Sequence, residues 1–136
     1  MNIAFAGVVT RPDSPDVEQV GREVVEWFGK RNIRAELNRI DPDMDVVIVL
    51  GGDGTLLHVA WEASRYQVPV LGVNFGNLGF LAEIAADEIY EALETLLVEE
   101  DVRMEHRIML STAFINGATG EMSPTVHALN EVVILK

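Results

Sequence analysis

Apolar residues follow two patterns over the first hundred positions: short unbroken runs alternate with stripes spaced three and four apart. Unbroken runs bounded by polar turns are typical of strands buried on both faces. Three such runs are predicted strands, at 2–9, 46–50 and 70–73. A more polar segment at 34–40 is predicted as an additional, more exposed strand.

Three amphipathic helices are predicted between and after these strands. Ser14 is the predicted N-cap of the first, with Pro15 at the first helical position and Asp16 in the first turn. Asn32 is a predicted exit, and the apolar stripe comprises Val17, Val20, Val24, Trp27 and Phe28. The second helix is expected at 55–66. The third begins near Asp87 and carries the stripe Ile89, Ala92, Leu93, Leu96 and Leu97. This alternation predicts an α/β fold with a parallel sheet.

The pattern changes after residue 102. Segments 103–115 and 124–135 look extended, and the turn at 116–120 begins with Asn-Gly, which favours an antiparallel pair. Two strands alone are marginally stable and leave an apolar face uncovered. We therefore expect an α/β nucleotide-binding domain at 1–102, followed at 103–136 by the first strands of a truncated, β-rich second domain.

Composition narrows the possible partners. The 136 residues include 22 acidic and 10 basic side chains, a formal net charge of −12, so nucleic acid is not an expected partner. Backbone N–H groups can still bind a small anion. The sequence has no cysteine, and no apolar run approaches membrane-spanning length. The apolar start lacks a basic region and is interpreted as a strand rather than a signal peptide. We expect a cytoplasmic protein with no membrane partner.

The segment Gly51-Gly52-Asp53-Gly54-Thr55 directly follows the strand at 46–50. Its glycines let the backbone turn sharply and let a ligand approach closely, and the next helix directs its N–H groups to the same space. Such a turn suits a pyrophosphate. Asp53 would then accept a proton from a hydroxyl or help hold a divalent cation. Alternatively, Asp53 or Thr55 merely caps the helix, and the turn alone does not decide between these readings.

Two further segments favour a binding site. The strand at 70–73 ends in Asn74 and a glycine-rich loop to Leu81, at the sheet edge where ligands bind. Phe75 and Phe80 form an apolar wall for a purine or pack under the loop, and for Phe80 we favour packing. Asn130-Glu131 interrupts the apolar run 129–135. If buried, the pair needs polar partners such as ribose hydroxyls; strand alternation could instead point Glu131 to solvent.

These three segments, in this order and spacing, resemble the motifs of the NAD kinase family. The first is shared with a superfamily that includes 6-phosphofructokinases and lipid kinases, which implies a phosphofructokinase-like, Rossmann-like domain. The resemblance implies that Asp53 is the general base toward the adenosine 2′-hydroxyl of NAD and that Gly54 contributes backbone. It also places His58 near the dinucleotide. Asn130 and Glu131 would hold its ribose, and Asn74 and Phe75 would lie beside the adenine.

The same resemblance implies phosphoryl transfer to NAD from ATP, or from polyphosphate, with Mg²⁺, giving NADP. No direct protein ligands to the metal are predicted, and the intact protein is expected to form a dimer or tetramer. Because family members continue into a second domain that supplies much of the NAD site, the 136 residues alone are expected to be inactive. The rival hypotheses are a kinase for a lipid or sugar phosphate and a nucleotide-binding module without catalysis.

Overall fold

The computed structural model describes residues 2–77, 79–82, 84–99 and 102–133. It divides into two compact units, Met1–Met104 and Glu105–Lys136, a division two residues beyond the predicted boundary. The strands of the first unit are β1 Phe5–Thr10, β2 Arg34–Leu37, β3 Val46–Gly51, β4 Val70–Asn74 and β5 Ile84–Ala85. Its helices are α1 Pro15–Gly29, α2 Asp53–Tyr66, the short 3₁₀ helix η1 Ala86–Glu88 and α3 Ile89–Val98.

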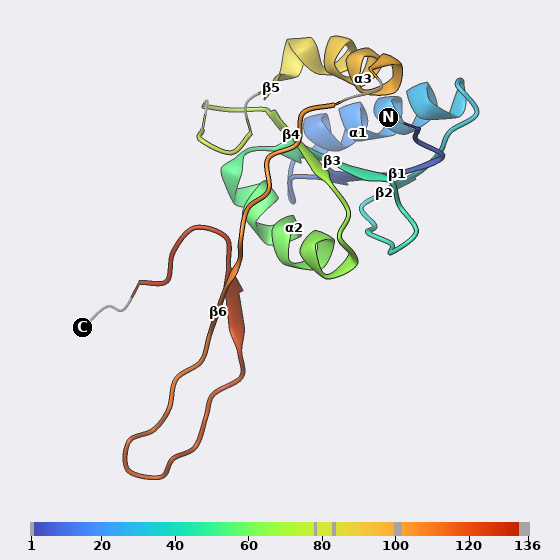
Figure 1. Cartoon of the computed structure of the whole chain (residues 1–136). Helices are drawn as coiled ribbons and strands as arrows, with labels where there is room; N and C mark the ends of the chain where they lie inside the picture. Colours follow the sequence, from blue (N-terminus) through green and yellow to red (C-terminus); the bar gives the residue numbers. More distant parts are fainter. Residues whose placement is uncertain (1, 78, 83, 100–101, 134–136) are drawn as a thin grey trace. The chain divides into compact units, whose positions relative to one another are not determined.

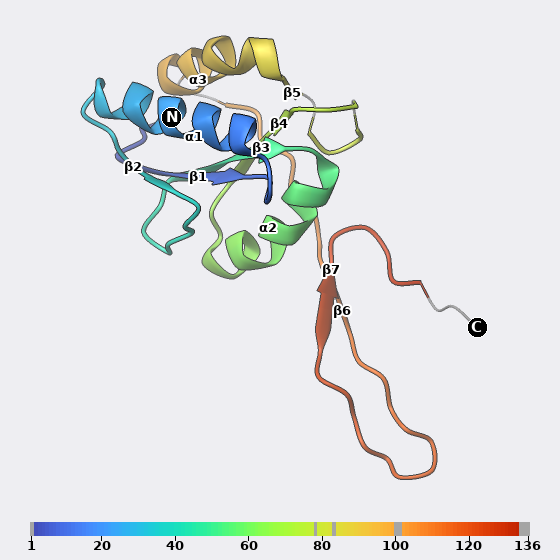
Figure 2. The same ribbon diagram turned by 180° about the vertical axis from the view of Figure 1, so that it is seen from behind.

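The strands of the first unit form one parallel sheet in the order β2-β1-β3-β4-β5. The central strand β3 is buried along its whole length, as its unbroken apolar run predicts. Helices α1 and α3 cover one face and α2 covers the other (Figures 1 and 2). The predicted α/β fold with a parallel sheet is confirmed.

The core of the first unit lies mainly between the sheet and the helices α1 and α3. Alternate residues of β3, namely Val46, Ile48 and Leu50, join a buried cluster with Phe28 of α1 and Leu93 of α3. The intervening residues of β3 face α2 by strand alternation. Among the described residues no helix is long and apolar enough to cross a membrane.

Helix α1 begins where predicted, but two details differ. Ser14 is the N-cap, yet it makes no side-chain cap hydrogen bond; its hydroxyl accepts one from Arg11 instead. The fully buried stripe is Val17, Gly21, Val24 and Phe28, while the predicted Val20 and Trp27 are half-buried. Gly21 lies against Thr10 and Leu37, where a Cβ would approach both side chains within 3 Å. The close approach of α1 to the sheet therefore depends on a residue with no side chain.

Several boundaries differ from the predictions. The first strand begins at Phe5 rather than residue 2, and α2 begins at Asp53 rather than 55. The second strand ends at Leu37 instead of continuing to residue 40, because Asn38 adopts a positive φ of 52°. Its side-chain oxygen accepts hydrogen bonds from the backbone N–H and the hydroxyl of Thr10, at 2.8 and 3.0 Å. The strand thus ends at a residue whose side chain binds β1, 28 positions earlier in the chain.

The second unit contains the predicted antiparallel pair in shorter form. Strand β6 is Leu110–Thr112 and β7 is Val126–Ala128, with an isolated bridge between Ile115 and Met122 nearer the turn. The predicted strand from 124 to 135 is therefore wrong over the described residues 129–133, because β7 ends before Leu129. Leu135 itself lies outside the described residues.

Candidate active site

The candidate site lies at the topological switch point of the sheet, at the carboxyl ends of β1 and β3. Strand β1 pairs with β2 on one side and β3 on the other, and the helices that follow β1 and β3 cover opposite faces (Figures 1 and 2). The connections therefore diverge at the carboxyl ends of these two strands, which is the position where open α/β sheets bind ligands. Thr10 of β1 is in register with Leu50 of β3. The glycine-rich turn follows directly.

The turn Gly51 to Thr55 is tightly built at its start. Gly51 ends β3, Gly52 is the extended N-cap, and α2 begins at Asp53. A Cβ on Gly51 would collide with Thr55 and would lie 3.2 Å from the Cβ of Arg11. Gly54 is exposed, with open space where a Cβ would stand. The first N–H groups of α2 have no intrahelical acceptor and are available to an anion at this edge.

Asp53 is held by a loop that follows β4. Its Oδ2 accepts a hydrogen bond from the N–H of Phe80 at 2.8 Å, and its Oδ1 accepts two, from Leu81 at 3.0 Å and Ala82 at 3.1 Å. These bonds, the one from Phe80 first, hold the pKa of the Asp53 carboxyl below its ordinary value, against a smaller opposing effect of desolvation. Asp53 is half-buried and does not simply cap its own helix, since α2 has no side-chain cap hydrogen bond.

Asn74 lies beside this turn at the end of the neighbouring strand. It is in register with Gly51 and is only 6% exposed. Its amide nitrogen donates to the carbonyl of Asn77 at 2.8 Å, and its amide oxygen accepts from the N–H of Gly76 at 3.0 Å. Asn74 therefore shapes the loop after β4, and its predicted contact with a ligand stays a prediction.

The two phenylalanines of this loop differ. Phe75 is half-buried and packs against the core cluster, and its N–H donates to the carbonyl of Gly51 at 2.6 Å. Phe80 is 91% exposed, so the expectation that its ring packs under the loop is wrong. The reason is that the backbone of Phe80, rather than its ring, is fixed, through the hydrogen bond to Asp53.

The remaining predicted site residues are exposed. His58 lies on α2, four residues beyond Gly54 and so on the same face of the helix. Asn130 and Glu131 belong to the second unit, where Asn130 is in a bend after β7 and Glu131 follows it outside any strand. Their predicted position within an apolar strand is wrong, and both are solvent-exposed within their unit. Their predicted contacts with a dinucleotide stay predictions.

Arg11 was not among the predicted site residues. It follows β1 directly, its N–H donates to the carbonyl of Leu50 at 2.8 Å, and its Cβ lies next to Gly51. Among the described residues Arg11 forms no ion pair, whereas five other arginines pair with Asp or Glu, namely Arg22, Arg31, Arg34, Arg39 and Arg107. The sequence signal was a basic residue directly after the first strand.

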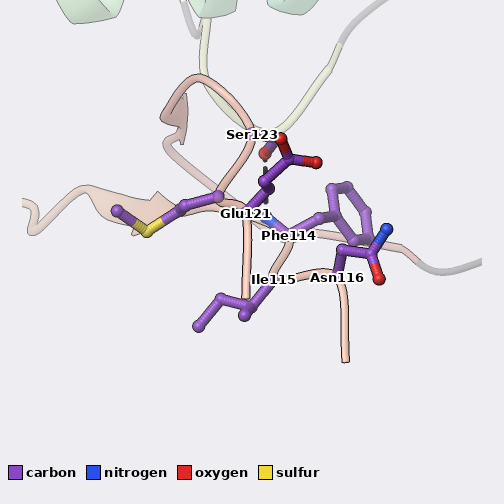
Figure 3. Close-up of a pocket in the computed structure, with 6 residues that line it drawn as sticks. Phe114, Ile115, Asn116, Glu121 and Ser123 are labelled. Atoms are coloured by element: carbon purple, nitrogen blue, oxygen red, sulfur yellow. Dashed lines mark hydrogen bonds between the residues drawn. The ribbon is translucent and has the colours of Figure 1, made fainter. Parts of the chain in front are cut away.

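Two hollows of the described chain lie away from the glycine-rich turn. One hollow in the first unit lies between the β5 edge and α3 and is lined by residues that include Leu71, Ile84 and Leu96. Another, on the hairpin, is lined by Phe114 to Asn116 and Glu121 to Ser123 (Figure 3). Neither contains Asp53 or Asn74. Within the described part of the chain, no three His, Asp or Glu side chains gather as metal ligands.

A parallel sheet of this topology, with a glycine-rich turn and a carboxylate at its change of winding, defines an α/β nucleotide-binding domain. The sequence matches the family model described as the ATP-NAD kinase N-terminal domain over residues 22–101. The chain belongs to the NAD kinase family, as its three motifs predicted.

Individual relatives agree with this assignment. The chain is 36% identical to an NAD kinase of Heliobacterium modesticaldum and 39% identical to one of Magnetococcus marinus, over 96% of the chain in each case. It spans 50% and 48% of those two proteins, about half of the length of the curated relatives it matches.

Solved structures share the fold. A yeast NADH kinase complexed with NADH superposes with a TM-score of 0.72 and 17% identity, covering 94% of this chain and 44% of that one. An NAD kinase from Archaeoglobus fulgidus in complex with ATP gives a TM-score of 0.54 and 19% identity, covering 80% and 40%. At these identities the likeness concerns the fold alone.

Proposed function

We propose that the chain supplies the catalytic half of an NAD kinase, which transfers a phosphoryl group from ATP or polyphosphate to the adenosine 2′-hydroxyl of NAD. The observation that supports this best is Asp53, a half-buried carboxylate at the start of α2, beside N–H groups that favour anions. A carboxylate placed among phosphate-binding groups weakens the binding of anions. Its presence there therefore indicates a role in the chemistry. Accepting the proton of an attacking hydroxyl is such an action.

The other residues around the glycine-rich turn would bind the phosphates. The backbone from Gly51 to Gly54 and the first turn of α2 offer N–H donors, and Arg11 offers the cationic side chain at the carboxyl end of β1. His58 shares the helix face of Gly54 and would reach the same anion. Asn74 and Phe75 would then lie beside the adenine, in the loop that follows β4.

Mg²⁺ is proposed to enter with the phosphoryl donor. Magnesium in such sites is commonly bound through one or two carboxylates together with substrate phosphates and waters. Here the donor phosphates and waters would hold the ion, and no side chain of this chain is proposed as a direct ligand. The ion would offset the charge that develops on the transferred phosphoryl group.

We also propose that residues after about 102 begin a β-rich second domain that completes the NAD site through Asn130 and Glu131. Two facts support this: the chain spans about half of its relatives, and the hairpin leaves many apolar side chains uncovered. The chain alone is then expected to be inactive.

Two further parts complete the proposal. The intact protein would assemble into a dimer or tetramer, which light scattering tests. It would also be cytoplasmic, which cell fractionation tests.

The central test is Asp53→Asn in an extended protein, in which the chain is followed by a second half of the length found in its relatives. Losing a general base typically costs 10²- to 10⁴-fold in turnover. We expect kcat to fall by about that factor, while calorimetry still detects NAD binding. Asp43→Asn, at an exposed carboxylate in the turn before β3, is the matched control and should retain activity. Unchanged turnover in the Asp53 variant would refute the role of Asp53.

The rival functions are separated by substrate and by binding. NAD, a sugar phosphate and a lipid diol offered side by side to the extended protein identify the acceptor, and we expect phosphorylation of NAD alone. Calorimetric titration of the extended protein with NAD and with ATP–Mg²⁺ tests the non-catalytic hypothesis. Binding without turnover of any acceptor would favour a nucleotide-binding module.

A further inference from the structure

The three hydrogen bonds that Asp53 accepts from described residues leave one acceptor position of its carboxylate open. A carboxylate offers about four acceptor positions, two on each oxygen. Oδ1 uses two, toward Leu81 and Ala82, and Oδ2 uses one, toward Phe80. Toward the described residues, one acceptor position therefore remains, and it belongs to Oδ2. Asp53 thus presents a single open acceptor position, and its carboxylate does not rotate freely.

The loop that donates these bonds is anchored at its far end. Ala82 is 1% exposed and packs over β4, where a Cβ on Gly72 would lie 3.1 Å from the Cα of Ala82. A larger residue at 72 would lift the loop away. The end of the loop at Ala82 is therefore held against β4 by a contact that does not involve Asp53.

The near end of the loop depends on Gly79. A Cβ built on Gly79 would collide with all three carboxyl atoms of Asp53. Any other residue at this position would force either the loop or the carboxylate to move. By contrast, a Cβ on Gly76 in the same loop would stand 3.9 Å from its nearest neighbour, at ordinary contact distance.

From this geometry we propose that Gly79–Ala82 is an amide clamp that positions Asp53, with Gly79 as the positioning residue, so that Oδ2 alone accepts the substrate hydroxyl. The inference rests on the proposed kinase function and adds to it the atom that takes the proton. As the hydroxyl oxygen bonds to the γ-phosphorus, the bond from that phosphorus to the β,γ-bridging oxygen breaks. The nucleoside diphosphate leaves, and the hydroxyl proton passes to Oδ2.

The clamp also stabilises the charged form of the Asp53 carboxylate. The same N–H donors that orient the carboxylate stabilise its charge, so Asp53 is ionised at neutral pH and its pKa is low for a base. In the ground state its contribution is orientation, and a misplacement of about 1 Å can cost about 10²-fold in rate.

The test is a carbon-detected NMR titration of the Asp53 carboxyl in the 136-residue chain, which requires no turnover. In the unsubstituted chain we expect a pKa below that of an ordinary aspartate. In Gly79→Ala it should rise toward the ordinary value, because the clamp opens. The matched control Gly76→Ala should leave it unchanged. An ordinary pKa in the unsubstituted chain, or a low pKa that persists in Gly79→Ala, would overturn the clamp.

A second pair of variants guards against misfolding of Gly79→Ala. Phe80→Pro removes the N–H that donates to Oδ2, whereas Phe80→Ala retains that N–H and removes only an exposed ring. We expect the Asp53 pKa to rise in the proline variant and not in the alanine variant. Equal titration curves for the two variants would also overturn the clamp.

Kinetics of the extended protein separate this inference from the proposed function. With the clamp, Gly79→Ala lowers kcat about 10²-fold, leaves KM for ATP nearly unchanged, and moves the acid limb of the pH profile of kcat upward. If Asp53→Asn retains turnover, the proposed function fails whatever the titration shows. If Asp53→Asn is inactive but Gly79→Ala keeps the kcat and acid limb of the unsubstituted protein, only the clamp fails.

Discussion

The two units of this chain use similar apolar residues in opposite ways. In the first unit Phe28, Ile48 and Leu93 are fully buried between the sheet and its helices. In the second unit Phe114, Ile115 and Leu110 are 60%, 69% and 42% exposed on a two-stranded hairpin. Every buried hydrophobic residue of the described chain belongs to the first unit.

The difference shows that apolar content does not make a core without a second layer. The parallel sheet is covered by helices of the same unit, because the crossovers after β1 and β3 each place a helix on one of its faces. A hairpin has two faces and no crossover, so its side chains alternate between two exposed sides, as Phe114 and Ile115 do in Figure 3. The first unit can therefore hold a site rigidly, whereas the second requires a partner surface.

The largest expected effect tests this contrast with one substitution made in both units. Phe28→Ala should lower the free energy of unfolding by about 3–5 kcal/mol, because it leaves a cavity in the core. Phe114→Ala should change it by less than about 0.5 kcal/mol. Urea unfolding followed by tryptophan fluorescence reports on the first unit, which contains both Trp27 and Trp61. A comparable loss from Phe114→Ala would mean that the hairpin stabilises the first unit.

A smaller effect is expected from a glycine in each unit. Gly51→Ala should cost about 1–3 kcal/mol, because its Cβ collides with the stiff Thr55 side chain at the start of α2. Gly117→Ala, in the hairpin turn with open space around it, should be near neutral. The same denaturation experiment measures both. A neutral Gly51→Ala would show that the turn before α2 adapts easily and is not a preformed phosphate cradle.

The same contrast explains which predictions from sequence succeeded. Strand β3 was predicted within one residue, because a β-branched run buried on both faces has few alternatives. The hairpin was predicted too long, because its length depends on the surface that covers it. The apolar run after Ala128 predicted a strand. In the described residues, however, β7 pairs only with β6, and Asn130 and Glu131 lie beyond the end of β7.

At the site, the sequence identified residues but not their partners. The glycine-rich turn and Asp53 were predicted from local spacing, and the structure brings them beside Asn74. The three N–H groups that hold Asp53 come from residues 27 to 29 positions away, and backbone donors leave no residue-type signal. Arg11 was missed for a related reason, since its role depends on which strands are neighbours, and that order is a property of the sheet.

Substrate affinities of the extended protein sharpen the comparison at the site. Arg11→Ala should raise KM for ATP about tenfold, because a charge-assisted hydrogen bond to phosphate is lost, and should leave KM for NAD nearly unchanged. Lys30→Ala, at the exposed end of α1, is the control in the same unit. Glu131→Gln should have the opposite selectivity, raising KM for NAD. An Arg11 variant with normal KM for ATP would place the donor phosphates elsewhere.

The smallest expected effect is a pH dependence confined to the first unit. Because the folded-state pKa of Asp53 lies below its unfolded value, near 3.8, its hydrogen bonds add stability that is complete above 3.8. That stability is lost as the pH falls through the folded-state pKa. The free energy of unfolding of the unsubstituted chain, minus that of Asp53→Asn, should therefore be constant near neutral pH and shrink below 3.8. Glu131→Gln, exposed in the second unit, is the control. If the difference for Asp53→Asn stays constant down to pH 2, the amide hydrogen bonds to Asp53 do not stabilise the first unit in solution.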